Sequence, residues 1–382
     1  MKVLVTGGAG FIGSHCVDLL LTHGHEVRVL DALAPPVHAP DRVPDYLSSE
    51  VELLLGDVRD RDAVVRALAD VEAVVHLAAY QDYLPDFSHF LDVNATGTAL
   101  LYETIVGGRL PIRKVVVASS QAVYGEGKAL CPDHGVQYPP MRPAAQLRAG
   151  RWETTCPECR SNLTPLATDE TRVNPHTPYA ISKYSQELLS LRLGERYGIP
   201  AVCLRFSIAQ GSRQSFRNAY SGILRTFVAR MLHGRPPVVY EDGGQRRDYV
   251  YVGDAARAIL LVLEDDRANG SACNVGTGKA VTVLEYAHRL TKTMGVDVDP
   301  VVPGHYRVGD TRHIVSDSAL LEGLGWRPTA SLDTIMTEYV EWATSQPALA
   351  DVSDEAGETM LSLGALRRSG TRDSTGELPP RR

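Results

Sequence analysis

The stretch Thr6-Gly7-Gly8-Ala9-Gly10-Phe11-Ile12-Gly13 decides the fold of this chain of 382 residues. It follows the apolar run Val3-Leu4-Val5, which is typical of a strand, and it precedes a helical pattern over Ser14–Thr22. The spacing G-x-x-G-x-x-G lets the backbone turn tightly and approach a pyrophosphate, whose charge is favoured at a helix N-terminus. Such a string alone can be a plain loop, but a strand before it and a helix after it indicate a dinucleotide site. We therefore assign cofactor binding to Gly7, Gly10, Phe11, Ile12 and Gly13.

Two acids that follow later strands are assigned to the same cofactor. Asp31 ends the second strand, where its carboxylate would accept hydrogen bonds from the adenosine ribose. A carboxylate there repels a 2′-phosphate, so the sequence predicts NAD rather than NADP, the alternative being a surface turn residue. Asp57, beside Val58 after the third strand, is placed near the adenine amine, although an acid in this position is often only a helix cap.

The arrangement along the chain predicts an α/β fold. Short apolar runs alternate with helical patterns over residues 1–125, which indicates right-handed βαβ units and a doubly wound parallel sheet. The same dinucleotide-binding part would resume over 169–206, with a helix at Pro178–Tyr197 and a strand at Ala201–Phe206.

Three further segments complete the predicted organisation. Residues 126–168 are rich in Pro, Gly and Arg and have no clear period, so we interpret them as an insertion. A smaller C-terminal substrate region is predicted over 207–346. The polar residues 347–382 are predicted to form a mostly disordered tail.

Composition excludes several classes of protein. Hydrophobic residues make up 44% and charged residues 22%, which is ordinary for a globular protein. The formal net charge of −7 argues against a nucleic-acid surface. No apolar run reaches the ~18 residues that span a bilayer, and the chain opens on a strand rather than a signal peptide, so we expect a cytoplasmic protein.

Tyr179 and Lys183 lie four residues apart on one predicted helix, so their side chains share a face. A free tyrosine titrates near pH ~10, and a nearby ammonium lowers that pKa toward the range that acid–base work on a sugar hydroxyl needs. Ser120 lies just past the strand Lys114–Ala118, at the carboxyl end of the sheet, where a hydroxyl can bridge a substrate oxygen and the tyrosine. A serine there can also simply cap a turn, and the neighbouring Ser119 is the structural control.

The insertion holds a possible metal site. Its ligands would be Cys131 and His134, spaced C-x-x-H, and Cys156 and Cys159, spaced C-x-x-C. Two such pairs resemble a Cys3His structural zinc site, in which four protein ligands leave no position for catalysis. The alternative is a set of free thiols and a surface histidine in an irregular loop.

The order of motifs resembles the extended short-chain dehydrogenase/reductase family, specifically its nucleotide-sugar epimerases and dehydratases. The motifs shared with this family are Thr6–Gly13, His76-Leu77-Ala78-Ala79, Asn94, Ser119–Gly125, Tyr179–Lys183, Arg247–Val252, Asn274-Val275-Gly276 and Arg307-Val308-Gly309-Asp310. Together they span residues 1–342 in family order, apart from the insertion.

The resemblance implies a role for each matching residue. It makes Ser120, Tyr179 and Lys183 the catalytic set on a Rossmann sheet, and it adds Leu77, Ala78, Ala79 and Asn94 to the residues that bind NAD. Arg247 and Arg307 would contact the diphosphate of a nucleotide-diphosphate (NDP) sugar, a role that suits the planar fork of arginine. Two helices, at Asn94–Gly107 and Pro178–Tyr197, would pair across a homodimer.

The reactions of the family members differ according to the residues that follow the position of Ser120. Here Gln121 and Ala122 supply no carboxylate or thiol for a second proton transfer, which disfavours dehydration and decarboxylation. The prediction is NDP-hexose 4-epimerisation: transient oxidation at C4, rotation of the 4-keto sugar and return of the hydride. A 4-ketoreductase or net dehydrogenase would use the same residues. A non-catalytic NAD-dependent sensor is disfavoured because the whole catalytic set is present.

The predicted sugar pocket departs from the pattern of the 4-epimerases. Their sequence at this position resembles Arg-Tyr-Phe-Asn, whereas this chain has Arg205-Phe206-Ser207-Ile208. An isoleucine at the position of a hydrogen-bonding amide predicts a preference for a 6-deoxyhexose. Gln121, Ile208 and Asn218 are therefore assigned to the substrate, although Gln210 or the helix after Asn218 could supply the missing amide. The nucleotide base and the hexose stay open.

Overall fold

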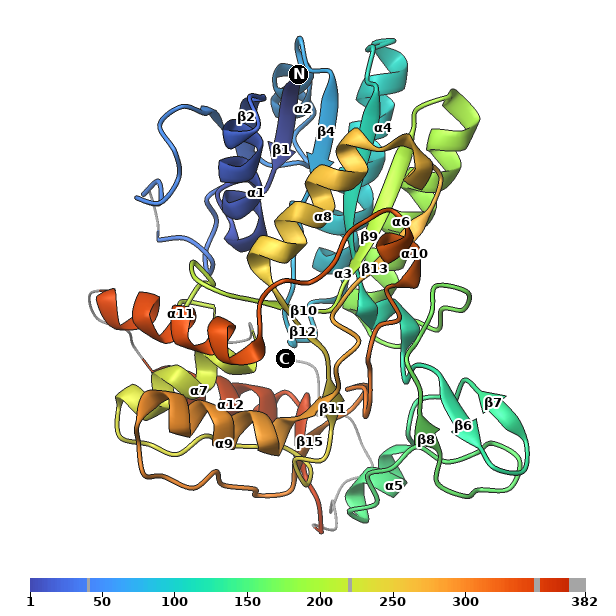
Figure 1. Cartoon of the computed structure of the whole chain (residues 1–382), viewed down its shortest axis with the longest axis vertical. Coiled ribbons are helices and arrows are strands. Elements are labelled where there is room, and N and C mark those ends of the chain that lie inside the picture. The colour runs from blue at the N-terminus through green and yellow to red at the C-terminus, as the bar shows by residue number, and fades with distance from the viewer. Residues whose placement is uncertain (40–41, 219–221, 347–350, 371–382) are drawn as a thin grey trace.

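The computed structural model describes residues 1–39, 42–218, 222–346 and 351–370. Its centre is a seven-stranded sheet in the order β13-β9-β5-β4-β1-β2-β3, with every neighbouring pair parallel (Figure 1). The strands are β1 (Lys2–Thr6), β2 (Glu26–Asp31), β3 (Glu52–Leu55), β4 (Ala73–His76), β5 (Lys114–Ser120), β9 (Ala201–Phe206) and β13 (Ala272–Val275). The strand order reverses between β1 and β4, so the predicted doubly wound sheet is confirmed.

Helices cover both faces of this sheet. One face carries α1 (Phe11–Thr22) and α8 (Val252–Glu264), which pack side by side, and the other carries α2 (Arg61–Leu68), α4 (Gly97–Gly107) and α6 (Pro178–Tyr197). Strand residues alternate between two apolar cores, as the period of two requires: Val116 belongs to the first core, and Val115 and Val117 to the second. Because both faces are buried, the strands are mainly apolar, which explains the apolar runs in the sequence.

A third apolar core holds the C-terminal region together. Its members come mainly from α7 (Ile223–Leu232), α9 (Val283–Met294) and α11 (Leu332–Ser345). Short strand pairs connect this region: β10 (Ile208–Gln210) with β12 (Tyr249–Tyr251), β11 (Arg246–Arg247) with β14 (Val281–Thr282), and β15 (His305–Arg307) with β16 (Leu366–Arg368). The remaining short helices are α3 (Phe87–Phe90), η1 (Leu91–Thr96), η2 (Gln121–Tyr124), η3 (Asp266–Ala268) and α10 (Ala319–Gly323).

The region predicted over 207–346 is not a separate unit. Within it, α8 and β13 return to the central sheet, where α8 packs on α1 and β13 pairs with β9. The sheet gains its last strand and helix this way, because the edge of β9 and the apolar face beside α1 would otherwise be uncovered.

The predicted disordered tail is wrong over 351–370. Helix α12 (Ser353–Ser362) buries Ala356 and Met360, and β16 pairs antiparallel with β15. Asp354 forms ion pairs with Arg230 and Arg235, which lie on and just after α7. These contacts order a segment whose own sequence is polar. The rest of the predicted tail lies outside the described residues.

The insertion folds as a small module at the side of the molecule (Figure 1). Its strands β6 (Ala129–Cys131), β7 (Gly135–Gln137) and β8 (Thr164–Pro165) form an antiparallel sheet in the order β7-β6-β8, and α5 (Ala144–Arg148) lies between β7 and β8 in the chain. Its apolar core consists of Ala129, Cys131, Cys156 and Leu163 alone. Throughout the described part of the chain, no helix combines the length and apolarity needed to cross a membrane.

Candidate active site

The glycine loop connects β1 to α1 at the carboxyl edge of the sheet. Gly7 has a φ of +70°, and a Cβ there would lie 2.8 Å from the backbone nitrogen of Ala78. A Cβ on Gly13 would lie 2.1 Å from the carbonyl oxygen of Gly7. Both positions therefore exclude any side chain. Helix α1 begins after Gly10 without a side-chain cap, so its first N–H groups face the loop, as a pyrophosphate site requires.

A cavity of about 2030 Å³ extends from this loop across the sheet edge to the C-terminal region. Single ligand sites span roughly 300–1,000 Å³, so the cavity can hold a dinucleotide and a second nucleotide together. The predicted cofactor and substrate residues that line it are Gly7, Gly10, Phe11, Ile12, Gly13, Asp31, Asp57, Val58, Leu77, Ala78, Ala79, Ser120, Gln121, Tyr179, Lys183, Ile208, Asn218, Arg247 and Arg307. Segments far apart in the sequence thus meet around one space.

The two acids assigned to the adenosine lie in different environments. Asp31 is buried, and its carboxylate accepts hydrogen bonds from the backbone of Ala9 (3.0 Å) and Leu33 (2.9 Å), so it is already bonded to both neighbouring loops. Asp57 pairs with the guanidinium of Arg59 at 2.7 Å, and this hydrogen bond lowers the pKa of the carboxyl. The cap of the following helix α2 is Asp60, so Asp57 is positioned by Arg59 and not by a capping role.

Asn94 does not line the cavity. Its side chain is fully buried and accepts from the backbone nitrogen of Tyr80 at 2.7 Å. Its two N–H groups donate to the carbonyl of Tyr80 (3.0 Å) and the hydroxyl of Ser182 (2.8 Å). These bonds hold the chain after Ala79 against α6. Asn94 therefore lies behind the cavity wall and holds Tyr80, which does line the cavity, and its predicted contact with the cofactor stays a prediction.

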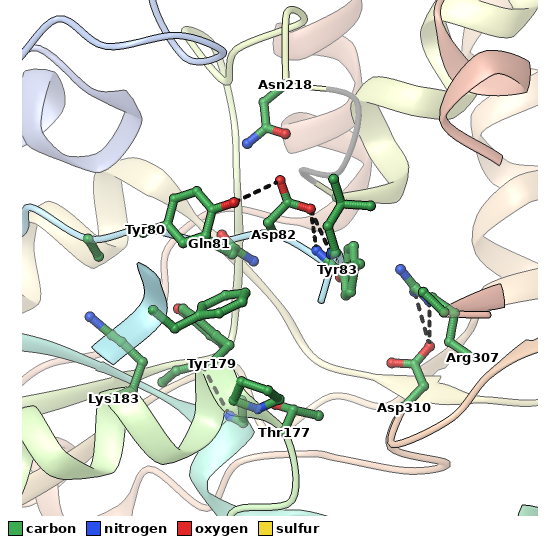
Figure 2. Close-up of a pocket in the computed structure, with 18 of the residues that line it drawn as sticks. Tyr80, Gln81, Asp82, Tyr83, Thr177, Tyr179, Lys183, Asn218, Arg307 and Asp310 are labelled. Carbon is green, nitrogen blue, oxygen red and sulfur yellow. Dashed lines mark hydrogen bonds and ion pairs between the residues drawn. The ribbon is translucent and has the colours of Figure 1, made fainter. Parts of the chain in front are cut away.

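Helix α6 places Tyr179 and Lys183 on its cavity-facing side (Figure 2). The helix begins because Thr177 caps it, accepting from the backbone of Ala180 at 3.1 Å, and Pro178 suits the first turn. Burial raises the pKa of Tyr179 to about 12, and the Ser120 hydroxyl opposes that shift. Burial lowers the pKa of Lys183 to about 7. Its side-chain nitrogen donates to Gln186 at 2.6 Å.

Ser119 and Ser120 at the end of β5 have different surroundings. Ser119 is buried and its hydroxyl donates to Glu187 at 2.9 Å, inside an ion pair between Glu187 and Arg205. Ser120 lines the cavity, and its oxygen accepts from the backbone of Ala122 at 3.1 Å, which caps η2. Both serines border the cavity, but the Ser119 hydroxyl is bonded to Glu187, so Ser120 is the better placed of the two to meet a ligand beside Tyr179.

Arg247 and Arg307 reach the far end of the cavity from two strands. Arg307, on β15, pairs with Asp310 at 3.0 Å and lies over the ring of Tyr83, 3.9 Å from its centroid (Figure 2). Arg247, on β11, donates to the backbone carbonyls of Thr311 (2.6 Å) and Arg312 (2.9 Å). Both cations are therefore held by the segment that follows β15.

Sequence reasoning assigned Leu77–Ala79 after β4 but missed Asp82, further along the same loop. Asp82 is buried, lines the cavity, and is turned toward Asn218 in Figure 2. Its Oδ1 accepts from the backbone of Tyr83 (2.5 Å) and Leu84 (3.0 Å), and no lysine or arginine of the described ranges pairs with it. Burial raises the pKa of this carboxyl. The available signal was its place just past a strand that ends at the ligand edge of the sheet.

The C-terminal segment supplies the rest of the missed lining. From α12, Ser353, Ala356 and Met360 face the cavity, and so do Leu366 and Arg367 on β16. No local pattern predicts this wall, because it depends on the pairing of β16 with β15.

The four proposed metal ligands converge. The ligand atoms of Cys131, His134, Cys156 and Cys159 all lie within 4.8 Å of one another. The sulfur of Cys131 is 3.6 Å from that of Cys159, and Nδ1 of His134 is 3.5 Å from the sulfur of Cys131 and 3.6 Å from that of Cys156. With Zn–S and Zn–N bonds of about 2.3 and 2.0–2.1 Å, a tetrahedron has edges of roughly 3.8 and 3.5 Å. The arrangement fits zinc.

Known proteins share this combination of sheet, loop and helix. A curated relative, the dTDP-L-rhamnose 4-epimerase of Burkholderia thailandensis, is 33% identical over 351 residues, covering 90% of this chain and 95% of its own. The UDP-glucose 4-epimerase of Thermotoga maritima, solved with UDP-glucose, is 29% identical with a TM-score of 0.74, covering 90% of this chain and 98% of that one. The UDP-glucose 4-epimerase of Thermus thermophilus, solved with NAD, is 30% identical with a TM-score of 0.72, covering 91% and 100%.

Other curated relatives carry the names dTDP-glucose 4,6-dehydratase and UDP-N-acetyl-alpha-D-glucosaminuronate decarboxylase, so the similarity extends across several reactions of nucleotide sugars. The family match itself covers residues 3–146 and 157–276, which leaves out only part of the insertion between its two pieces. It therefore includes the glycine loop, Ser120 and the Tyr179–Lys183 pair, and on these grounds the chain belongs to the NAD dependent epimerase/dehydratase family, within the extended short-chain dehydrogenases/reductases.

Proposed function

We propose that the protein is an NAD-dependent NDP-hexose 4-epimerase. The observation that carries the proposal is the grouping of Ser120, Tyr179 and Lys183 on one wall of the cavity, while the next two positions, Gln121 and Ala122, have no acid or thiol. Oxidation and reduction at one carbon need a single proton carrier, whereas dehydration and decarboxylation need further groups.

The chain's own residues then divide the work. Tyr179 takes the proton of the sugar 4-hydroxyl and later returns it. The Ser120 hydrogen bond opposes the rise that burial causes in the pKa of Tyr179. A charged Lys183 would stabilise the phenolate further. NAD supplies a reversible hydride acceptor for C4 and is not consumed over a full cycle. Gly7, Gly13 and Asp31 would hold it, as the crowded glycine loop and the buried carboxylate permit.

The substrate end of the cavity supports a 6-deoxyhexose. Ile208 lines it with an apolar side chain, in register with Tyr249 across β10 and β12. A relative named for dTDP-L-rhamnose, a 6-deoxyhexose, matches over 90% of the chain. Arg247 and Arg307 would bind the diphosphate between the sugar and the nucleoside.

A panel of uridine and thymidine diphosphate sugars tests the proposal. The expected result is a C4 epimer formed from one sugar, with no accumulation of NADH and no released keto sugar. NADH formed in proportion to product would establish a dehydrogenase instead.

Dehydration is the second candidate, and one observation favours it. Asp82 places a carboxylate in the cavity, from a different loop than the one the sequence singled out. If Asp82 removes a proton from carbon, a 4-keto-6-deoxy sugar will appear in the same panel.

A homodimer is the proposed assembly. Helix α6 exposes Ile181 and Leu188, seven residues apart on one face, and the neighbouring α3 and η1 expose Phe87 and Leu91. Exposed apolar side chains along adjoining helices favour pairing with a second copy. Light scattering of the purified protein, with Leu188→Glu as the disrupting variant, tests it.

The insertion is proposed to bind one structural zinc ion. Four converging ligands, three of whose six separations match tetrahedral edges, support this. So does an apolar core of only four residues, which is too small to hold the module by burial alone. Elemental analysis should find about one zinc per chain.

A further inference from the structure

A cluster of buried charges joins the insertion to the C-terminal region. Its members are Glu126, Arg142 and Glu153 from the insertion, and Glu241, Asp242 and Arg312 from the C-terminal region. Four of the six side chains are at most 2% exposed. Burial of this many charges is costly unless every one is paired, so the two parts of the chain must dock in one geometry.

Arg142 is the first connection. Its guanidinium donates to Glu126 (2.9 Å), to Glu241 (3.0 Å) and to the backbone carbonyl of Trp152 (2.8 Å). Its remaining terminal nitrogen donates to the backbone carbonyl of Asp310 at 2.7 Å. The insertion thereby holds the backbone of the very residue whose carboxylate pairs with Arg307.

Arg312 is the second connection. Glu153 accepts from its guanidinium at 2.6 and 3.0 Å, and also from His313 at 2.8 Å. The backbone nitrogen of Arg312 donates to Glu126 at 2.6 Å. Arg312 and the preceding Thr311 present the carbonyls that accept from Arg247. The segment 310–312 is thus held on one side by the insertion and holds both cavity arginines on the other.

The same acids stand close to the Cys/His ligands in the chain. Glu126 lies just before β6, which ends at the ligand Cys131, and Glu153 lies three residues before the ligand Cys156. The backbone of Leu163 bonds to Thr154 at 3.0 Å, and β6 pairs with β8, so short ladders join the two ligand-bearing segments. A metal bound by Cys131, His134, Cys156 and Cys159 would clamp these segments together.

We propose that the insertion is a metal-clamped element that positions the substrate site. Through Arg142 and Glu153 it fixes segment 310–312, and this segment in turn fixes Arg247 and Arg307. Occupancy of the Cys3His site therefore sets the affinity for the nucleotide diphosphate. The proposal rests on the proposed function in taking a nucleoside diphosphate as the group that the two arginines bind. Arg142 and Glu153 are positioning residues, because neither lines the cavity with its charged group.

The test measures binding of UDP and dTDP to the full-length protein by calorimetry, together with zinc content. Glu153→Gln removes one charge from a side chain that is 36% exposed, so the fold tolerates it better than loss of Arg142. The expected result is a dissociation constant about 3-fold to 30-fold higher, the scale of energetic coupling through packed networks, with zinc content unchanged. Cys159→Ser, at an exposed ligand, should lose zinc and weaken binding by a similar factor. In turnover assays both variants should raise KM and leave kcat near the wild-type value.

The control is Glu285→Gln, which breaks a carboxylate–arginine pair of 2.7 Å on the surface of α9, where the glutamate is 46% exposed. It should change neither binding nor zinc. Wild-type protein that binds neither nucleotide would contradict the proposed function. The positioning role alone would be overturned if nucleotide bound equally tightly to wild type, Glu153→Gln and zinc-free Cys159→Ser. It would also be overturned if the wild-type protein bound nucleotide but no zinc.

Discussion

The guanidinium of Arg307 lies over the ring of Tyr83, 3.9 Å from the ring centroid, and so joins the loop after β4 to strand β15. The contact joins Tyr83, beside the sugar end of the cavity, to Arg307, a cation at the far end of the cavity. Removing the ring should weaken substrate binding without touching the catalytic set. We expect Tyr83→Leu to raise KM by about 2-fold to 30-fold, which corresponds to the 0.5–2 kcal/mol of a cation–π contact, and to leave kcat nearly unchanged. Tyr197→Leu is the control, because its ring lies beside Arg196 on the surface of α6. Equal KM values in Tyr83→Leu and wild type would show that the stacking does not orient Arg307.

Tyr179→Phe removes the proposed proton carrier and almost no volume. We expect kcat to fall by about 100-fold or more while the dissociation constant of the nucleotide sugar stays the same. Tyr184→Phe, on the next turn of α6, should keep its activity. Turnover in Tyr179→Phe above about a tenth of the wild-type rate would remove Tyr179 from the mechanism.

Lys183 makes stability depend on pH in the free protein. Burial lowers its pKa from 10.5 to about 7, so between these values the unfolded chain binds the proton more tightly than the folded one. The free energy of unfolding therefore gains from this residue as the pH rises from about 7 to about 10. Urea denaturation should show wild type becoming more stable relative to Lys183→Met over this window. A difference that does not vary with pH would mean that Lys183 keeps its ordinary pKa.

Ile208 is expected to select at C6 of the sugar. A hydroxyl left without a partner beside it costs about 1–3 kcal/mol, and a buried methyl gains about 0.8 kcal/mol. Catalytic efficiency on a thymidine-diphospho-6-deoxyhexose should therefore exceed that on dTDP-glucose by about ten-fold or more. Ile208→Asn should narrow this ratio. Equal efficiency of the wild type on the two sugars would show that another cavity group satisfies the hydroxyl; Gln210 does not line the cavity, because it is fully buried and accepts from Tyr286.

Asp82 distinguishes the two candidate reactions. If Asp82 only accepts hydrogen bonds from sugar hydroxyls, Asp82→Asn should raise KM and preserve most of kcat. If Asp82 is a second proton carrier, Asp82→Asn should lower kcat by about 100-fold or more. Asp86→Asn is the control, because Asp86 also bonds the Tyr80 hydroxyl, at 3.2 Å, but does not line the cavity.

The sequence by itself determined the features that depend on neighbouring residues. The glycine loop, the helix at Pro178–Tyr197 and the four-residue step from Tyr179 to Lys183 follow from local periodicity, capping and spacing, and the structure contains each of them. The mainly apolar strands determined the parallel sheet for the same reason, since a strand buried on both faces has no polar side. The C-x-x-H and C-x-x-C pairs also predicted their own convergence within the insertion.

Only the tertiary structure decided what long-range contacts create. Asn94 matched a family motif, but its hydrogen bonds to Tyr80 and Ser182 could be seen only in the folded chain. Asp82 became part of the cavity because β4 ends at the same edge as β5. Residues 351–370 are polar and were expected to be disordered, yet β15 and the arginines beside α7 order them into a wall of the site. The physical reason is the same in each case: hydrogen bonds and ion pairs between distant segments contribute nothing to local periodicity, so they are absent from the sequence pattern and arise only when the chain has folded.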